Sequence, residues 1–375
     1  MPVTDSPIRM RSFGPVIVHE GRSIAMKRLA CRPPRTALPS PAAPPGRRAA
    51  LLGAGAFATA ALLAGRVAAA PSPAIGTPRK LTLSWSPSSL CHIAVPVAVK
   101  EGFFIRHGLD VDLISWGSTT DALLASLSTG KADIAVGMVL RWIKPLEQGF
   151  DVRLTGGTHA GCMRIMAAPS AHIANLGHLR GKRIGIGDVA GVDKNFFAIA
   201  LKKAGVNPVT DVDWRTFPPD MLGVAISKGE VDAISTGDPL AYNLRRSAGL
   251  IEIASNMDAE YANRACCVIA AGGALLRNDR PAAAAATLAL VEAADWAHHH
   301  PAEAAAIFAP YAPTRNLEEL TDTLRSYGNH RHPTGRDFRG DIIAYVNELK
   351  DIEVIKPSVN AERFADRICV DVLAS

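Results

Sequence analysis

Apolar positions after about residue 80 recur in two alternating patterns, and these patterns predict strands that alternate with helices. LTLSW (81–85), VDLISW (111–116) and ADIAVGM (132–138) follow the every-second-residue pattern of strands, whereas helical spacing covers 93–104 and 119–130. The alternation continues with a helix at 139–149 and a strand at 152–157. It then restarts, with strands expected at 182–187, 212–217, 231–236, 251–255 and 266–275 and helices at 192–205 and 220–229.

This rhythm predicts two α/β units, because strands that alternate with helices form mostly parallel sheets covered by those helices. After Asn278 the sequence is almost wholly helical, in segments that begin near residues 280, 301, 318, 341 and 361. A folded part of about 300 residues usually divides into two domains rather than growing a single core. We therefore expect two lobes followed by a helical tail.

The first 70 residues have the composition of an export signal. Six prolines fall within 32–46, Arg47 and Arg48 follow, and residues 49–65 carry no charge. The pair of arginines before a weakly apolar run resembles a twin-arginine signal, with the start at Met1 or Met26. We expect cleavage near Ala70 or Ala74 and a periplasmic location. The alternative, a membrane anchor, requires about 20 strongly apolar residues, which this run lacks.

The positive net charge of the chain comes from this N-terminal segment. The whole sequence carries a formal net charge of +6. Residues 1–70 contain ten basic and two acidic side chains, which leaves 31 basic and 33 acidic side chains for the remaining 305 residues. The expected mature protein is therefore slightly acidic. No nucleic-acid partner is expected, because such binding needs a basic patch on the folded domain.

Four segments in order carry a family resemblance: AVKEGFFIRHGLDVDLISW, LLASLSTGKADIAVGM, LRGKRIGIGDVAGVDKNFFAIALKKAGV and SKGEVDAISTGDPLA. They resemble the periplasmic substrate-binding proteins of nitrate/sulfonate/taurine-type ABC importers. The resemblance implies the two-lobed α/β fold called periplasmic binding protein type II, with a ligand cleft between the lobes and the C-terminal helices on lobe one. Lobe one is expected at 79–160 plus 268–375, and lobe two at 161–267.

The same resemblance implies a carrier without enzymatic activity or cofactor. It would capture a small solute, such as a sulfonate, nitrate or similar oxyanion, by hinge closure and deliver it to a membrane permease. We expect a monomer whose partners are the solute and the permease.

Candidate ligand contacts follow from the rule that ligands collect beyond the carboxyl ends of parallel strands. Helix N-termini at these loops would suit an oxyanion, and Arg141 and Arg164 are candidate cations for it. Asp238 would repel an anion unless a cation compensates it. Capping alone would explain Ser118 and Thr119, and packing alone would explain Trp85. The candidates are Ser84, Trp85, Cys91, His92, Ser118, Thr119, Gly137, Met138, His159, Val189, Ala190, Gly191 and Asp238.

Two pairs of cysteine and histidine fall among these positions. Cys91, His92, His159 and Cys162 together offer the thiol and imidazole ligands that zinc or copper favours, so a metal or a metal complex is an alternative ligand. A Cys91–Cys162 disulfide and simple packing are the other interpretations. Adjacent Cys266 and Cys267 lie in an apolar stretch and are expected in the core.

An enzyme is the alternative from another functional class. The same superfamily includes pyrimidine-precursor synthases, which carry an iron- and cysteine-rich motif. This sequence lacks such closely spaced cysteines, and it contains no GxSxG, HExxH or P-loop motif. A sensory ligand-binding module would share every feature of the carrier.

Overall fold

A computed structural model describes residues 77–115, 120–312, 316–327 and 331–374. The predicted signal at 1–70 and the candidates Ser118 and Thr119 lie outside these residues. In the described part of the chain, no helix combines the length and the apolar character needed to cross a bilayer.

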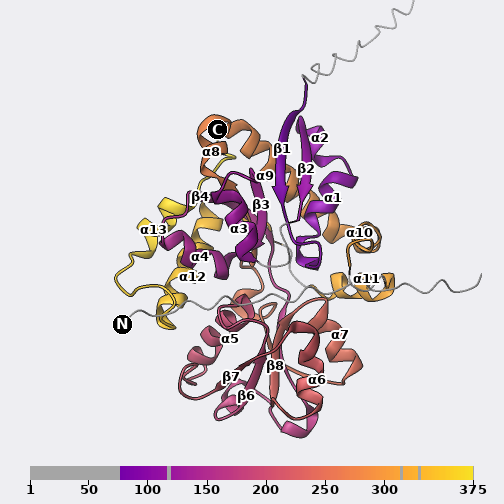
Figure 1. Cartoon of the computed structure of the whole chain (residues 1–375), viewed down its shortest axis with the longest axis vertical. Helices are drawn as coiled ribbons and strands as arrows, with labels where there is room; N and C mark the ends of the chain where they lie inside the picture. Colours follow the sequence, from indigo (N-terminus) through magenta and orange to yellow (C-terminus); the bar gives the residue numbers. More distant parts are fainter. Residues whose placement is uncertain (1–76, 116–119, 313–315, 328–330, 375) are drawn as a thin grey trace, which may run out of the picture. The chain divides into compact units, whose positions relative to one another are not determined.

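The strands form two sheets of five, with the same internal layout (Figure 1). Sheet one has the order β2-β1-β3-β10-β4, and sheet two has the order β7-β6-β8-β5-β9. The strands of sheet one are β1 (Arg79–Ser84), β2 (Leu109–Ile114), β3 (Ile134–Met138), β4 (Val152–His159) and β10 (Cys267–Gly272). Those of sheet two are β5 (Met163–Ala167), β6 (Arg183–Ile186), β7 (Asp213–Thr216), β8 (Ala233–Gly237) and β9 (Ile251–Ser255).

Helices connect most of these strands. Those of the strand-rich part are α1 (Ala94–Lys100), α2 (Phe103–Arg106), α3 (Thr120–Ser128), α4 (Val139–Glu147), α5 (Val192–Lys203), α6 (Leu222–Ser227) and α7 (Leu240–Ser247). Those of the tail are α8 (Gly273–Asn278), α9 (Arg280–His299), α10 (Pro301–Phe308), α11 (Leu317–Ser326), α12 (Gly335–Asp351) and α13 (Ala361–Ile368).

The antiparallel strand in each sheet is the feature that the strand–helix rhythm did not predict. In sheet one, β10 runs antiparallel to both β3 and β4. In sheet two, β5 runs antiparallel to both β8 and β9. Each of these strands follows directly from the other sheet, so the chain crosses once between β4 and β5 and returns between β9 and β10. The two-lobed α/β fold expected from the resemblance is confirmed.

Local differences from the predicted elements have simple causes. The helix expected at 93–104 is divided, because Gly102 adopts the left-handed conformation (φ 72°) that ends α1. The strand expected at 266–275 ends at Gly272, and Gly273 begins α8. The short elements β5 and α7 were not predicted, since Arg164 and the polar residues of 240–247 interrupt their apolar patterns.

One aspartate anchors each sheet at the start of its third strand. Asp133 Oδ2 accepts a hydrogen bond from the Thr82 backbone N–H at 2.8 Å, next to β3. Asp232 Oδ2 accepts one from the Arg183 backbone N–H at 2.8 Å, next to β8. The segments GKAD (130–133) and GEVD (229–232) therefore both fix the start of one strand against its parallel neighbour.

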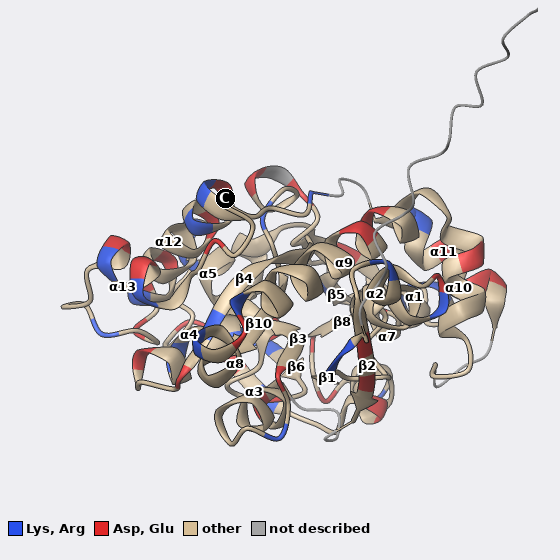
Figure 2. Cartoon of the chain, turned by 90° about the horizontal axis from the view of Figure 1, so that it is seen from above, with Lys and Arg blue, Asp and Glu red and all other residues tan. Residues whose placement is uncertain are grey.

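The tail helices cover sheet one. Helix α9 packs against α1, α2 and β4, while α12 and α13 pack against β4 (Figure 1). Asp279 begins α9 by accepting a hydrogen bond from the Ala282 N–H at 3.1 Å. Acidic and basic residues are interspersed along α12 and α13, whereas in α11 the acidic residues precede the one arginine of its last turn (Figure 2).

Candidate functional site

The carboxyl ends of strands from the two sheets meet at an ion pair. Arg141, in α4 just after β3, donates to both carboxylate oxygens of Asp121, with Nε to Oδ1 at 2.7 Å. Its Nη2 also lies 3.3 Å from Asp188 Oδ2, in the loop after β6. The hydrogen bond to Asp121 raises the pKa of Arg141. Arg141 is thus already neutralised by two carboxylates and joins the strand ends of both sheets.

Arg164 is also neutralised by two carboxylates. The residue is 3% exposed on β5, and its guanidinium lies 3.2 Å from Asp238 and 2.7 Å from Glu252. It also donates to the Ser326 hydroxyl in α11 at 3.3 Å. Burial opposes the charge, but the Asp238 and Glu252 carboxylates raise the pKa of Arg164 overall. Arg164 is therefore the cation that compensates Asp238, and not an available partner for an anion.

Asp238 directly follows β8 and lies two residues before the start of α7. Its Oδ1 accepts a hydrogen bond from the Tyr242 N–H at 2.8 Å, and the side chain is fully enclosed. Burial raises the pKa of Asp238 to about 6, although Arg164 acts in the opposite direction. The carboxylate is thus occupied by a helix start and a buried arginine.

Of the candidates after β1, Ser84 and Trp85 are both buried. The Ser84 hydroxyl has no hydrogen-bond partner among the described residues and is fully enclosed. Trp85 is 3% exposed and meets Tyr311 edge to face, with ring centroids 5.0 Å apart. Trp85 thus packs on a ring that follows α10, and its role as a ligand contact stays a prediction.

The loop after β6 is exposed, whereas the end of β3 is closely packed. Val189 and Ala190 are exposed, and the Ala190 N–H donates to Asp188 Oδ1 at 3.0 Å. Gly191 begins α5. Gly137 has no room for a side chain, because a Cβ there would lie 2.0 Å from the Trp142 ring. Met138 beside it is half-buried.

Four cysteines come together where the sheets are connected, and we call Cys91, Cys162, Cys266 and Cys267 the thiol cluster. Cys91 lies in a short helical turn after β1, Cys162 in the crossing after β4, and Cys266 and Cys267 at the start of β10. All are buried and carry free thiols. A disulfide between Cys91 and Cys162 is therefore not formed in this structure.

The four thiols of the cluster shift one another's pKa. Cys162 is the largest cause that raises the pKa of Cys91, to about 11. Cys162 and Cys267 lower the pKa of Cys266, since both stabilise its thiolate.

The two candidate histidines differ in their relation to this cluster. A ring nitrogen of His92 and the sulfurs of Cys91 and Cys267 all lie within 4.8 Å of one another. His159 pairs with Cys267 across β4 and β10, but its ring packs edge to face on Tyr327 with centroids 4.7 Å apart. The structure therefore places His92 beside Cys91 and Cys267, and Cys267 was not among the predicted ligand contacts.

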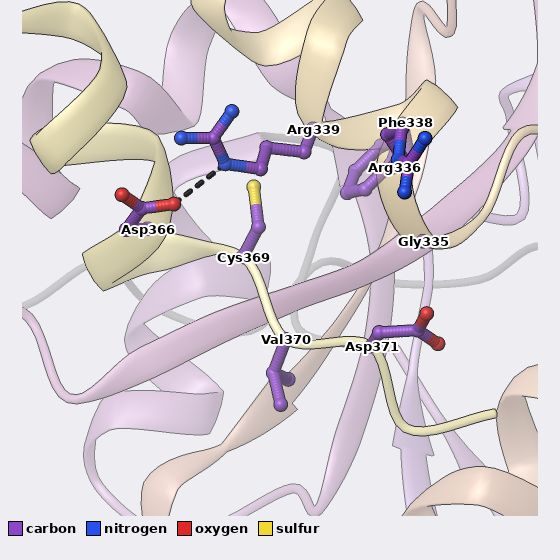
Figure 3. A pocket seen from close by; sticks show the side chains of 8 residues that line it. All are labelled: Gly335, Arg336, Phe338, Arg339, Asp366, Cys369, Val370 and Asp371. Atoms are coloured by element: carbon purple, nitrogen blue, oxygen red, sulfur yellow. Dashed lines mark hydrogen bonds and ion pairs between the residues drawn. The ribbon is translucent and has the colours of Figure 1, made fainter. Parts of the chain in front are cut away.

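A separate hollow of about 440 Å³ lies where α12, α13 and the C-terminal segment meet (Figure 3). Its lining includes Cys369 and the Arg339–Asp366 ion pair, whose Nε–Oδ1 distance is 2.6 Å. None of the predicted ligand contacts lines it.

Sequence reasoning missed several residues that complete these contacts. Asp188, Glu252 and Ser326 supply partners to the two arginines, and Tyr311 and Tyr327 pack on candidate rings. No local sequence motif predicts such long-range partners. Cys266 and Cys267 did carry a signal, because they fall at the predicted return between the lobes, where Cys162 marks the outward crossing.

Two exchanged strands between two α/β sheets define the fold of periplasmic binding proteins. The chain belongs to the NMT1/THI5-like family, whose model matches residues 90–304. No curated protein is similar enough in sequence to count as a relative.

Solved structures with this fold include the periplasmic aliphatic sulphonate binding protein SsuA from Escherichia coli. It is 15% identical with a TM-score of 0.65, over 77% of this chain and 92% of that one. The alkanesulfonate-binding protein SsuA from Xanthomonas axonopodis pv. citri, bound to MOPS, is 14% identical (TM-score 0.64; 79% and 99% covered). The periplasmic nitrate-binding protein NrtA from Synechocystis PCC 6803 is 12% identical (TM-score 0.63; 78% and 86% covered).

Proposed function

We propose that this protein is the extracytoplasmic solute-binding component of an ABC importer. It captures a small solute between lobe one (79–160 and 268–375) and lobe two (161–267), and it delivers that solute to a membrane permease without catalysis. The leader at 1–70 exports it to the periplasm, where it acts as a monomer. Family membership and the shared fold of sulphonate- and nitrate-binding proteins support this proposal.

The observation that carries the proposal is the contact of Arg141 with Asp188. This contact joins the loop after β6 to the helix after β3, so the carboxyl ends of these two strands, one from each sheet, point toward the same region. A solute held there would contact loops from both sheets and would favour their approach over their separation. This geometry supports capture by closure.

We propose a small oxyanion such as nitrate or a sulfonate as the solute. Since Arg141 and Arg164 are neutralised by carboxylates, the anion would be held by backbone N–H groups at helix starts and by hydroxyl or imidazole groups. The start of α5 at Gly191 and the side chain of His159 are candidates for these contacts.

Titration calorimetry of the purified full chain with nitrate, ethanesulfonate and a protonated aminopyrimidine tests the solute class. We expect an anion to bind and to decrease the radius of gyration measured by X-ray scattering. His159→Ala should weaken binding, whereas Arg339→Ala, in the separate hollow of Figure 3, is the matched control and should not.

Each part of the proposal has its own contrary result. Binding of the aminopyrimidine alone would overturn the oxyanion but not the carrier. Binding without any change in the radius of gyration would overturn capture by closure. Consumption of the aminopyrimidine, detected by mass spectrometry, would establish an enzyme instead of a carrier.

A further inference from the structure

One buried carboxylate, that of Glu348 in α12, lies beside the segment by which the chain returns from sheet two to sheet one. The side chain is 8% exposed. Its Oε1 atom accepts three hydrogen bonds, from Lys203 Nζ at 2.6 Å, from Arg264 Nη1 at 2.8 Å and from the Tyr261 hydroxyl at 3.1 Å. Three donors on one oxygen atom make Glu348 the centre of this contact.

The donors come from different parts of the chain. Lys203 is the last residue of α5, which belongs to lobe two. Tyr261 ends a short helical turn (Ala259–Tyr261), and Arg264 follows it, so both lie in the return between β9 and β10. Helix α12, which carries Glu348, packs against α5 and against β4 of sheet one. A single carboxylate oxygen therefore joins lobe one, lobe two and the segment that connects them.

A second carboxylate completes the set, and we call Lys203, Glu260, Tyr261, Arg264 and Glu348 the Glu348 cluster. Glu260 accepts hydrogen bonds from Lys203 and from Arg264. Lys203 Nζ and Arg264 Cζ each lie 4.8 Å from the centroid of the Tyr261 ring. Two cations thus face two carboxylates, so the cluster is neutral as a whole and each of its charges has an opposite partner.

The other ion pairs between the lobes are more open to solvent. Asp188, the partner of Arg141, has a side chain that is 54% exposed, and Arg246, the partner of Asp322, is 56% exposed. Exposed pairs separate at little cost, whereas a buried carboxylate that loses its cations is strongly destabilised. In a hinge motion, displacement grows with distance from the connecting segments, where the Glu348 cluster lies.

We propose that the Glu348 cluster is the pivot about which the two lobes open and close. Its contacts persist in the open and the closed states, whereas the Arg141–Asp188 and Arg246–Asp322 pairs break as the lobes separate. This inference rests on the proposed function in one respect, since the motion that it describes is the one by which a solute would be captured. The Glu348 carboxylate limits the range of that motion.

Distances measured in the full chain without solute test the pivot. Spin labels on a bio-orthogonal amino acid are placed at the exposed positions Ala125 and Asp220, one in each lobe, and in a second protein at Lys202 and Asp351, on either side of the cluster. Pulsed electron paramagnetic resonance then compares each labelled protein with the same protein carrying Asp188→Asn and Asp322→Asn. We expect the 125–220 distance to lengthen and the 202–351 distance to stay the same.

Two results of this comparison would overturn the proposal. An equal lengthening of both distances would show that the lobes move apart at the cluster as well. No change in either distance would show that the exposed pairs do not hold the lobes together, which the proposal requires.

A substitution in the cluster tests the role of the carboxylate. Glu348→Gln keeps the shape of the side chain but removes its charge, so the 202–351 distance distribution should become broader. Glu230→Gln is the matched control, because Glu230 is exposed in the turn before β8 and its side chain has no polar partner among the described residues. Equal distributions in wild type and Glu348→Gln would contradict the role of this carboxylate.

The two parts of the test cover different failures. The comparison of label pairs leaves the cluster intact, so it remains decisive if Glu348→Gln does not fold. No solute is present in any of these measurements. Failure of nitrate or sulfonate to bind would therefore overturn the proposed solute and leave the pivot in place, whereas failure of the pivot would leave solute binding unaffected.

Discussion

At the scale of a single residue, Arg164 shows how a buried charge is compensated in this protein. Its guanidinium is surrounded by Asp238, Glu252 and the Ser326 hydroxyl, and almost none of it reaches solvent. A buried arginine could have served as an anion receptor, and the sequence alone left that interpretation open. Its contacts assign it instead to compensating two carboxylates.

Replacing Arg164 therefore should destabilise the protein strongly. Arg164→Met leaves the buried Asp238 carboxylate without a cation, and removal of one partner of a buried pair costs about 3–5 kcal/mol. Glu252→Gln is the matched variant: it keeps the Arg164–Asp238 pair and should cost less, about 1.5–3 kcal/mol. Urea unfolding measures both free energies, and equal losses would contradict this assignment.

Two glycines near the ends of corresponding strands make a second residue-scale comparison. Gly137, next to the last residue of β3, has Trp142 packed where a side chain would begin, whereas the nearest atom to a Cβ at Gly237, the last residue of β8, lies at 3.7 Å. Gly137→Ala should cost about 1–3 kcal/mol or more through overpacking. Gly237→Ala should change the free energy of unfolding by less than about 1 kcal/mol. A neutral Gly137→Ala in thermal unfolding would show that Trp142 moves easily.

At the scale of elements, the repeated aspartate explains why both sheets start their third strand in the same way. Asp133 and Asp232 each stand just before a buried strand and each hold the backbone N–H of the neighbouring parallel strand. Asp232 also receives two bonds from the Arg183 guanidinium, at 3.0 and 2.8 Å. Its carboxylate therefore joins two strands through three hydrogen bonds.

The Asp232 contact should make stability depend on pH in a defined direction. The Arg183 side chain lowers the pKa of Asp232 below 3.8, so its stabilisation is full above that value and is lost as pH falls through the lower folded-state pKa. Asp232→Asn should cost about 1–3 kcal/mol near neutral pH, and the difference from wild type should vanish in strong acid. A difference that persists unchanged in acid would contradict this origin.

Asp112→Asn is the control for the loss of one carboxylate, because Asp112 is exposed on β2 and no hydrogen bond or ion pair is described for it. Its free energy of unfolding should stay within about 0.5 kcal/mol of wild type near neutral pH.

At the scale of the described chain, ion pairs join a loop and two helices beside sheet two to helices beside sheet one and of the tail. Arg141 meets Asp188, Arg246 of α7 meets Asp322 of α11 at 3.3 Å, and Lys203 of α5 meets Glu348 of α12 at 2.6 Å. The first two pairs include side chains that are half-exposed or more. Such pairs are worth at most about 1 kcal/mol each and are screened by salt, so they bias the approach of the lobes without fixing it.

Removing the two exposed pairs should favour separation of the lobes. The double variant Asp188→Asn/Asp322→Asn should show a larger radius of gyration than wild type in X-ray scattering at low salt. The difference should shrink at high salt, because screening weakens the same pairs in the wild type. Identical scattering at every salt concentration would show that these pairs do not influence the opening.

The sequence by itself determined the two α/β units, the order of most strands and the resemblance to a family of solute-binding proteins. These features depend on local periodicity, on glycines such as Gly102, and on motifs that repeat in each unit. It also named Cys91, His92, His159 and Cys162 as candidate contacts, since each fell at a strand end or at a crossing, and this stays a prediction. The predicted leader, solute and permease remain proposals.

Only the tertiary structure decided which side chains meet. The two antiparallel strands, the neutralisation of Arg141 and Arg164, and the meeting of Cys91 and His92 with Cys267 depend on partners up to 176 positions apart, as between Cys91 and Cys267. A periodic pattern records which face of an element is buried, but not which distant element covers it. Pairing across the chain is set by packing and by the need of each buried charge and hydrogen-bonding group for a partner.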